Sequence, residues 1–562
     1  MSSAEPLAGG HAALADGRWD AARAAFEASL AGGETAEACF GLAAAQWWLG
    51  EDHACVATCA RAYTLFRRSG DVIGAARCAV WLAITYKANF ANHAAANGWL
   101  GRAERLLGAL PAGPAHGWLW VARAYRMADL DRAEDLTARA ADIARAAGDV
   151  DLELVALAQL GLVRVGKGDG AGFALIDEAM AAALAGERST LDTVVYACCD
   201  MLHACELASD IERAAQWCAV ADDFVATYGC PFLYAECRIY YGSVLAATGR
   251  WDDAGRELAA ALRITEGASP GLHARALVRM AGLRVRQGRL EEAEGLLARV
   301  GAAAQDEVEA ALSVAALLLA RGDAPAASRN LEQRMHHLAA HRSHLAAALD
   351  LLVDAHVASG DADAAAAAAA RLAEVGAPAG DDRLRAVVAG ADGRVRAARG
   401  DPEGAVAHLE EALAVWSRLD LPFEAARARF ELGRALAATR PDVAVDHIRR
   451  SLATFDALGA SLDADRAAAL LRSLGVAAPP GPKGVGTLTA REQQVLRLLG
   501  AGLSNPEIAA RLHVSRKTAA HHVSRILSKL HLRNRAAAAA YAAGALARAG
   551  EAAHGEPAPG RP

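Results

Sequence analysis

A stretch near the C-terminal end gathers side chains that could bind nucleic acid. It places three cations, two imidazoles and two hydroxyls within ten residues: Arg516, Lys517, Thr518, His521, His522, Ser524 and Arg525. Arg and Lys pair with phosphates, and polar side chains at the start of a helix can reach base edges in the major groove. These residues offer recognition of double-stranded DNA, and nowhere in the chain do we find a constellation for catalysis.

Three helix starts in sequence would position this stretch. The spacing of Thr489 to Glu492 and of Ser504 to Glu507 predicts two capping boxes, and Ser515 is the expected cap of a helix over about 516–530. The connection 512–515 is short enough for a helix-turn-helix. Helix N-terminal amides near Ser504 and Ser515 add donors for phosphate. A charged surface helix is the alternative. The apolar residues that recur at helical spacing are Val495, Leu496, Leu498, Leu499, Ile508, Ala509, Leu512, Val523, Ile526, Leu527 and Leu530.

The charge of the chain is unevenly distributed. The 562 residues carry net −7, yet residues 487–550 hold ten Lys and Arg against two Glu, net +8, which leaves −15 for the rest. A basic module joined to an acidic body indicates a polyanion partner for one end only. Between them, residues 475–486 are rich in Pro and Gly, which disfavour helix and strand. We therefore expect a body over 1–474, a flexible linker over 475–486, a basic domain over 487–550 and a disordered tail over 551–562.

The body repeats one turn signature, in which two small residues five positions apart join two apolar-periodic stretches. Its clear copies are Gly17–Ala22, Gly249–Ala254, Gly288–Ala293 and Gly400–Ala405, and looser copies start at Gly50, Gly98, Ala128, Gly168, Ser209, Gly322, Gly360 and Thr439. The mean period is a little over 38 residues, the size of a helix-turn-helix solenoid unit. The sequence thus predicts an all-α fold with about twelve helix pairs in the body.

The small residues in each copy have a packing role. The second small residue lets the second helix approach the first, and a larger apolar residue four positions later fills the groove. These larger residues are Phe26, Leu258, Leu297 and Leu409. Stacked pairs share a continuous core and expose a long concave binding surface. The pattern resembles tetratricopeptide repeats with a longer period.

The C-terminal motifs are similar to a known family. Leu488-Thr-x-Arg-Glu492, Gly502-Leu-Ser-Asn505, Glu507-Ile-Ala509 and Lys529-Leu530 resemble the LuxR-type DNA-binding domain over some 60 residues. Lys517 to Ser524 looks like the KTVxHHVS form common in actinobacterial members. The resemblance implies base contacts from Ala520, His521 and Ser524, and it adds Asn505 and Lys529 to the candidate DNA-binding residues. Ala520 stands where Lys or Arg is frequent and Ala519 where Val is, so the target sequence is left open.

The resemblance also extends to a fourth helix and to the body. A helix from about Asn534 to Arg548 would supply the dimer contact, with palindromic half-sites as the consequence. The alternative is that its Ala536 to Ala540 run forms helix without making a dimer contact. The units of about 38 to 40 residues look like the sensor superhelix of large LuxR-type regulators, whose ATPase module has no counterpart here.

Three patterns in the body resemble chemical sites, and we interpret each as structural. Cys55 and Cys59 could bind a soft metal or sense redox state, as could the cluster of Cys198, Cys199, His203 and Cys205. However, free Cys is usually a buried residue that packs in the core. The run Met335, His336, His337, His341 and His344 could bind Zn or Ni. Gly161 to Gly168 resembles a P-loop, yet it lacks the Ser or Thr for Mg and a preceding strand.

Aromatic residues gather in the early repeats. Nine of the ten tryptophans and every cysteine precede residue 252. One interpretation is an aromatic-lined ligand or partner site that includes Trp47, Trp48, Trp118 and Trp120. The interpretation we favour is that the early repeats use larger core residues.

Together these patterns predict a transcriptional regulator that is not an enzyme and needs no metal or cofactor. Its partners would be promoter DNA, RNA polymerase, a second copy of the chain on DNA, and a small-molecule or protein effector on the solenoid. No signal peptide and no apolar run near the ~18 to 20 residues of a membrane span is present, so we expect a cytoplasmic bacterial protein with reduced thiols. The rivals are a scaffold whose terminal domain only localises it on DNA, and a signalling ATPase.

Overall fold

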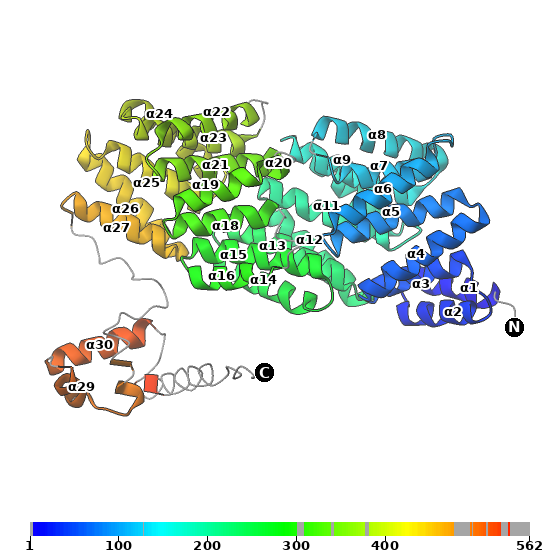
Figure 1. Cartoon of the computed structure of the whole chain (residues 1–562), viewed down its shortest axis with the longest axis horizontal. Helices are drawn as coiled ribbons and strands as arrows, with labels where there is room; N and C mark the ends of the chain where they lie inside the picture. The colour runs from blue at the N-terminus through cyan, green and yellow to red at the C-terminus, as the bar shows by residue number, and fades with distance from the viewer. Residues whose placement is uncertain are drawn as a thin grey trace, which may run out of the picture. The chain divides into compact units, whose positions relative to one another are not determined.

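The computed structural model describes residues 4–127, 129–300, 308–338, 342–376, 381–476, 495–496, 498–512, 515–529, 535 and 538–539. Within these ranges every regular element is an α-helix, which confirms the all-α prediction. The chain divides into two compact units, residues 1–458 and 459–562 (Figure 1). Most of the expected linker 475–486 and all of the expected tail lie outside the described residues, so both stay predictions.

The helices of the first unit follow one another with short turns. Their bounds are α1 (Ala4–Ala15), α2 (Trp19–Ala31), α3 (Ala36–Trp48), α4 (Asp52–Ser69), α5 (Val72–Ala88), α6 (His93–Leu107), α7 (Pro114–Ala124), α8 (Leu130–Ala147), α9 (Val150–Gly166), α10 (Gly172–Ala185), α11 (Asp192–Ala208), α12 (Ile211–Tyr228), α13 (Pro231–Ala247), α14 (Trp251–Thr265), α15 (Pro270–Arg286), α16 (Leu290–Ala298), α18 (Val308–Ala320), α19 (Ala324–Gln333), α20 (Met335–Leu338), α21 (Arg342–Ala358), α22 (Ala362–Gly376), α23 (Asp382–Ala398), α24 (Pro402–Arg418), α25 (Pro422–Leu436) and α26 (Pro441–Leu458). Apart from the short α20, the helices that the structure describes in this unit pack as twelve successive pairs, from α1 with α2 to α25 with α26.

Turn chemistry defines the pairs. Nine of the twelve sequence signatures begin at a residue with a positive φ of 54 to 89°: Gly17, Gly50, Gly168, Ser209, Gly249, Gly288, Gly322, Gly360 and Gly400. Glycine adopts this left-handed conformation without steric cost. The signature at Gly98 is wrong, because Gly98 lies inside α6 and the turn before that helix has its positive φ at Ala91. The signature at Ala128 falls outside the described residues, and Thr439, where the twelfth signature begins, has no positive φ.

Aspartate caps fix where many helices begin. The Asp side chain accepts a hydrogen bond from the backbone amide three residues later, which satisfies one of the amides that a helix start leaves unpaired. The residues that do so are Asp71, Asp129, Asp149, Asp210, Asp323, Asp361, Asp381 and Asp401.

The repeat positions expected to pack are buried. Ala22, Ala254, Ala293 and Ala405 are fully buried, and of the larger residues Phe26, Leu258 and Leu409 are at most 1% exposed, whereas Leu297 is half-buried. The described tryptophans are all buried or half-buried, and Trp19 and Trp48 stack at 4.2 Å in one core. This favours the core interpretation of the aromatic-rich early repeats.

Segments far apart in the sequence also meet, because the first unit coils back on itself. The buried carboxylate of Asp52 accepts hydrogen bonds from Asn89 Nδ2 at 3.0 Å and from Ser269 Oγ at 2.6 Å, and Ser269 is 217 residues away. Arg383 Nη1, at the start of α23, donates to Ser209 Oγ at 2.6 Å, just after α11. The repeat pattern contains no signal for these contacts.

Charged side chains on the first helices of several pairs form a network inside this unit. Arg275 Nη1 lies 2.7 Å from both carboxylate oxygens of Glu236, and Arg279 pairs with Glu206. Asp200 is 2% exposed and accepts from Tyr125 Oη at 2.9 Å. Burial raises the pKa of Asp200 to about 8.

Within the ranges described, none of the helices is both long and apolar enough to span a bilayer.

Candidate nucleic-acid interface

The second unit contains α27 (Ser461–Ser473), helical residues among 495–500, α29 (Asn505–Arg511) and α30 (Arg516–Lys529). The last three segments share one small core, and α29 packs against α30. The buried residues of this core are Val495, Leu496, Leu499, Ile508, Ala509, Ala519, Val523, Ile526 and Ala538. Apart from Leu530, which lies outside the described residues, the apolar positions predicted from helical spacing therefore meet, and they fix how α30 faces the other two helices.

Ser504 begins α29 with the predicted capping box. Its backbone amide donates to Glu507 Oε2 at 2.7 Å, and its hydroxyl donates to the same oxygen at 2.6 Å. These hydrogen bonds hold the pKa of Glu507 below its usual range. Pro506 lies in the first turn, where its missing N–H is harmless. Ser504 itself is exposed, so this helix start lies at the surface.

Ser515 caps the start of α30 by accepting a backbone hydrogen bond. Its Oγ accepts from the Thr518 amide at 3.0 Å and lies 2.8 Å from Thr518 Oγ1. Both residues are exposed. The two hydroxyls therefore fix the start of the helix, and they remain at the surface where a phosphate could approach.

The two faces of α30 differ in chemistry. Ala519, Val523 and Ile526 are at most 7% exposed and face the core. The residues that face solvent alternate with them: Arg516, Thr518, Ala520 and Ser524 are exposed, and His522 is half-buried. Lys517, His521, Arg525 and Lys529 lie on the same helix, with side chains outside the described part, so their predicted DNA contacts stay untested. The helix thus offers one polar face to a partner.

Asn505 has a structural partner that the sequence did not indicate. Arg535 Nη1 donates to Asn505 Oδ1 at 2.7 Å, and Arg535 also donates to the Leu503 carbonyl. The arginine ties the residues that follow α30 to the start of α29. Its only sequence signal is a cation at the beginning of the predicted fourth helix. Apart from Arg535, Ala538 and Ala539, residues 534–548 lie outside the described ones, and the dimer contact stays a prediction.

The segment resembling a P-loop has a packing role in the first unit. Gly161 lies where α9 crosses α10, and a Cβ there would come within 2.5 Å of the Gly172 carbonyl oxygen. Lys167 pairs with Asp131 and Glu134, at 2.5 and 2.8 Å. Gly168 takes the positive φ of the turn. Gly161, Lys167 and Gly168 of this motif therefore each have a structural role in the first unit.

The cysteines of the two metal-like patterns lie in packed cores of the first unit. Cys55 and Cys59 are fully buried in one core, and no disulfide joins the ten cysteines. Across the described ranges no three His, Cys, Asp or Glu side chains are arranged to hold a metal ion. His341 and the side chain of His337 lie outside those ranges, so the histidine run is not tested.

Two protein families match parts of this chain. Residues 486–542 match the luxR family of bacterial regulatory proteins, and residues 245–317 match tetratricopeptide repeats. Both families are non-enzymatic in general. Among solved structures, the Cut9–Hcn1 hetero-tetramer of APC/C is similar over 83% of this chain and 96% of that chain, with 13% identity and TM-score 0.37. Yeast Tom70 is similar over 79% and 98%, with 12% identity and TM-score 0.34.

Curated relatives match the C-terminal segment. The transcriptional regulatory protein LnrK of Bacillus subtilis is 52% identical over 54 residues, which are 10% of this chain and 24% of LnrK. The response regulator protein VraR of Staphylococcus aureus is 49% identical over 55 residues, 10% of this chain and 26% of VraR. The chain thus spans about a quarter of each relative. It carries a luxR-family helix-turn-helix domain at its C-terminal end and tetratricopeptide repeats in the preceding solenoid.

Proposed function

We propose that this protein is a DNA-binding transcription regulator. The observation that carries the proposal is α30, a capped helix with one face in the core and one polar face in solvent, inside a segment that matches the luxR family. An α-helix of this kind fits the major groove of double-stranded DNA. The net charge of +8 over residues 487–550 supports binding to a polyanion.

Several exposed residues of α30 would contact the phosphates and bases of DNA. Arg516 at the first turn would pair with a phosphate, and the amides near Ser504 and Ser515 would add donors. Farther along the exposed face, Ser524 would hydrogen-bond a base edge, and the Ala520 methyl would fit against a thymine methyl. Asn505, Lys517, Thr518, His521, His522, Arg525 and Lys529 complete the proposed contact set.

The solenoid would control this binding. Tetratricopeptide repeats support interaction with a protein, so we place a protein or small-molecule effector on the first unit. Its binding would shift the population of arrangements that present the helix-turn-helix to promoter DNA. In this proposal the protein works in the bacterial cytoplasm as a homodimer on DNA, together with RNA polymerase.

The proposal is tested with full-length protein and mixed genomic duplex fragments. Binding is followed by fluorescence anisotropy between about 50 and 200 mM salt, because released counterions make phosphate contacts salt-dependent. Arg516→Ala is expected to weaken binding and to reduce the slope of log K against log salt by about 0.9. The control is Arg466→Ala, an exposed arginine of α27, which should leave both unchanged. Equal effects of the two variants would contradict the assignment of α30.

A further inference from the structure

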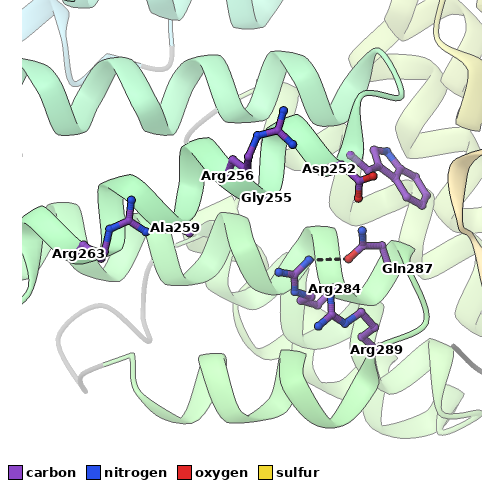
Figure 2. Close-up of a pocket in the computed structure, with 9 residues that line it drawn as sticks. Asp252, Gly255, Arg256, Ala259, Arg263, Arg284, Gln287 and Arg289 are labelled. Atoms are coloured by element: carbon purple, nitrogen blue, oxygen red, sulfur yellow. Dashed lines mark hydrogen bonds between the residues drawn. The ribbon is translucent and has the colours of Figure 1, made fainter. Parts of the chain in front are cut away.

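An open pocket in the first unit has four arginines in its lining. It has a volume of about 450 Å³ and lies between α14, the end of α15 and the start of α16 (Figure 2). Four of its nine lining residues are cations, Arg256, Arg263, Arg284 and Arg289, and Asp252 is the one carboxylate. The volume suits a small molecule.

The carboxylates near this pocket do not balance its arginines. Asp253 pairs with both Arg250 and Arg256, and Glu292 pairs with both Arg284 and Arg289. Arg263 is exposed and forms no ion pair with any residue of the described part. With Asp252 included, five arginines stand against three carboxylates. This local excess of positive charge lies outside residues 487–550, in the part of the chain whose net charge is −15.

Arg284 is the most enclosed of these cations. Its side chain is 16% exposed, its Nη1 donates to the neutral Gln287 Oε1 at 2.7 Å, and Glu292 lies 3.4 Å from its Nε. Burial and the charge of Arg289 lower the pKa of Arg284. The pocket wall facing it is Gly255, where even a Cβ would lie 3.9 Å from Nη1. An anion in the pocket would therefore meet a guanidinium that protein carboxylates only partly neutralise.

The spacing of the arginines indicates more than one anionic group. Arg256 and Arg263 are two helical turns apart on α14, about 10 Å along its axis. Arg284 and Arg289 come from the neighbouring helices, and Figure 2 shows them close together beside Gln287. Trp251 is 3% exposed and packs on Phe423, so it is not available to stack on a ligand ring. Charge is the chemistry that this pocket offers.

We infer that this pocket binds a small anion carrying at least two phosphate or carboxylate groups. Arginine forks suit both groups, because each can accept two parallel hydrogen bonds. The site is independent of DNA binding by the helix-turn-helix domain, and its test does not use DNA.

The test is isothermal titration of full-length protein with pyrophosphate and with citrate, at constant ionic strength, with orthophosphate as the single-group comparison. We expect saturable binding of at least one of the first two probes, about tenfold or more tighter than that of orthophosphate. Arg263→Glu should weaken binding by about tenfold or more. Arg329→Glu makes the same change at an exposed arginine of α19 and should change the affinity by less than about twofold.

Each possible result of the titration either supports or overturns the inference. Binding of pyrophosphate alone or of citrate alone supports the site and identifies the preferred group. No saturable binding of either probe at millimolar concentration overturns the inference. Equal loss in Arg263→Glu and Arg329→Glu overturns it too, as does orthophosphate binding as tightly as the larger anions. Circular dichroism of both variants checks that each is folded.

Discussion

Two glycines of the P-loop-like segment should respond in opposite ways to the same substitution. In Gly161→Ala the new Cβ would lie 2.5 Å from the Gly172 carbonyl oxygen and 2.5 Å from Ile176 Cγ1, where ordinary contacts begin near 3.4 Å. Helices α9 and α10 must therefore separate by nearly an ångström. In Gly166→Ala the nearest atom is Leu130 Cδ1 at 3.6 Å, so the methyl group fits.

The magnitudes follow from packing and helix propensity. Overpacking of a tight contact costs about 1–3 kcal/mol, and Gly→Ala within a helix stabilises by up to about 1 kcal/mol. Gly161→Ala should thus lower the free energy of unfolding by up to about 2 kcal/mol. Gly166→Ala, at the last residue of α9, should leave it unchanged or raise it by up to about 1 kcal/mol.

The assay is urea unfolding of the full-length protein, followed by circular dichroism, with and without Mg-ATP. We expect a lower midpoint for Gly161→Ala, an equal or higher midpoint for Gly166→Ala, and no effect of Mg-ATP on any of the three proteins. A nucleotide-binding loop predicts instead that Mg-ATP stabilises the unsubstituted protein and loses this effect in Gly166→Ala. That result, or equal destabilisation by both substitutions, would refute the packing argument.

Two further predictions concern the inside of the solenoid. Burial raises the pKa of Asp200 in the folded protein to about 8, whereas the unfolded chain releases this proton near pH 4. Between about pH 4 and 8 the folded state therefore binds one proton more, and the free energy of unfolding falls by roughly 1.4 kcal/mol per pH unit. The melting temperature of Asp200→Asn relative to the unsubstituted protein should therefore rise between pH 5 and 8, while that of the exposed Asp135→Asn stays constant; parallel curves for the two variants would show that Asp200 ionises freely. Arg383→Ala should lower the free energy of unfolding by about 1–3 kcal/mol, because it removes a charged hydrogen bond to Ser209, and should speed amide exchange in the last turn of α11. The exposed Arg385→Ala is its control, and unchanged exchange in Arg383→Ala would contradict the contact.

Local structure was predictable from the sequence because turns and caps depend on nearby residues. Gly249 and Gly400 occupy the turns that their signatures indicate, and Ser504 with Glu507 forms the expected cap. The turn predicted at Gly98 was wrong because, in the sequence, a small residue inside a helix resembles one in a turn. The true turn at Ala91 uses a residue that gives no such signal.

Contacts between distant segments were not predictable, because they depend on how tightly the pairs coil. Nothing in the local sequence around Asp52 indicates that its carboxylate meets Ser269. The arginine pocket is similar, since its cations come from α14, from α15 and from the residue before α16, and each one alone looks like a solvated surface residue. In the C-terminal domain the exposed face of α30 followed from its periodicity, whereas the partner of Asn505 required the position of Arg535.

Genome-wide capture of DNA in vitro by the full-length protein, read at two salt concentrations, would show whether the protein binds specific DNA sites through α30. We expect a few sharp peaks that weaken at higher salt and disappear in the double variant Lys517→Ala/His521→Ala, while Arg466→Ala keeps them. Featureless binding, or peaks that survive the double variant, would contradict a site-specific regulator and would favour a scaffold in which the solenoid is the working part.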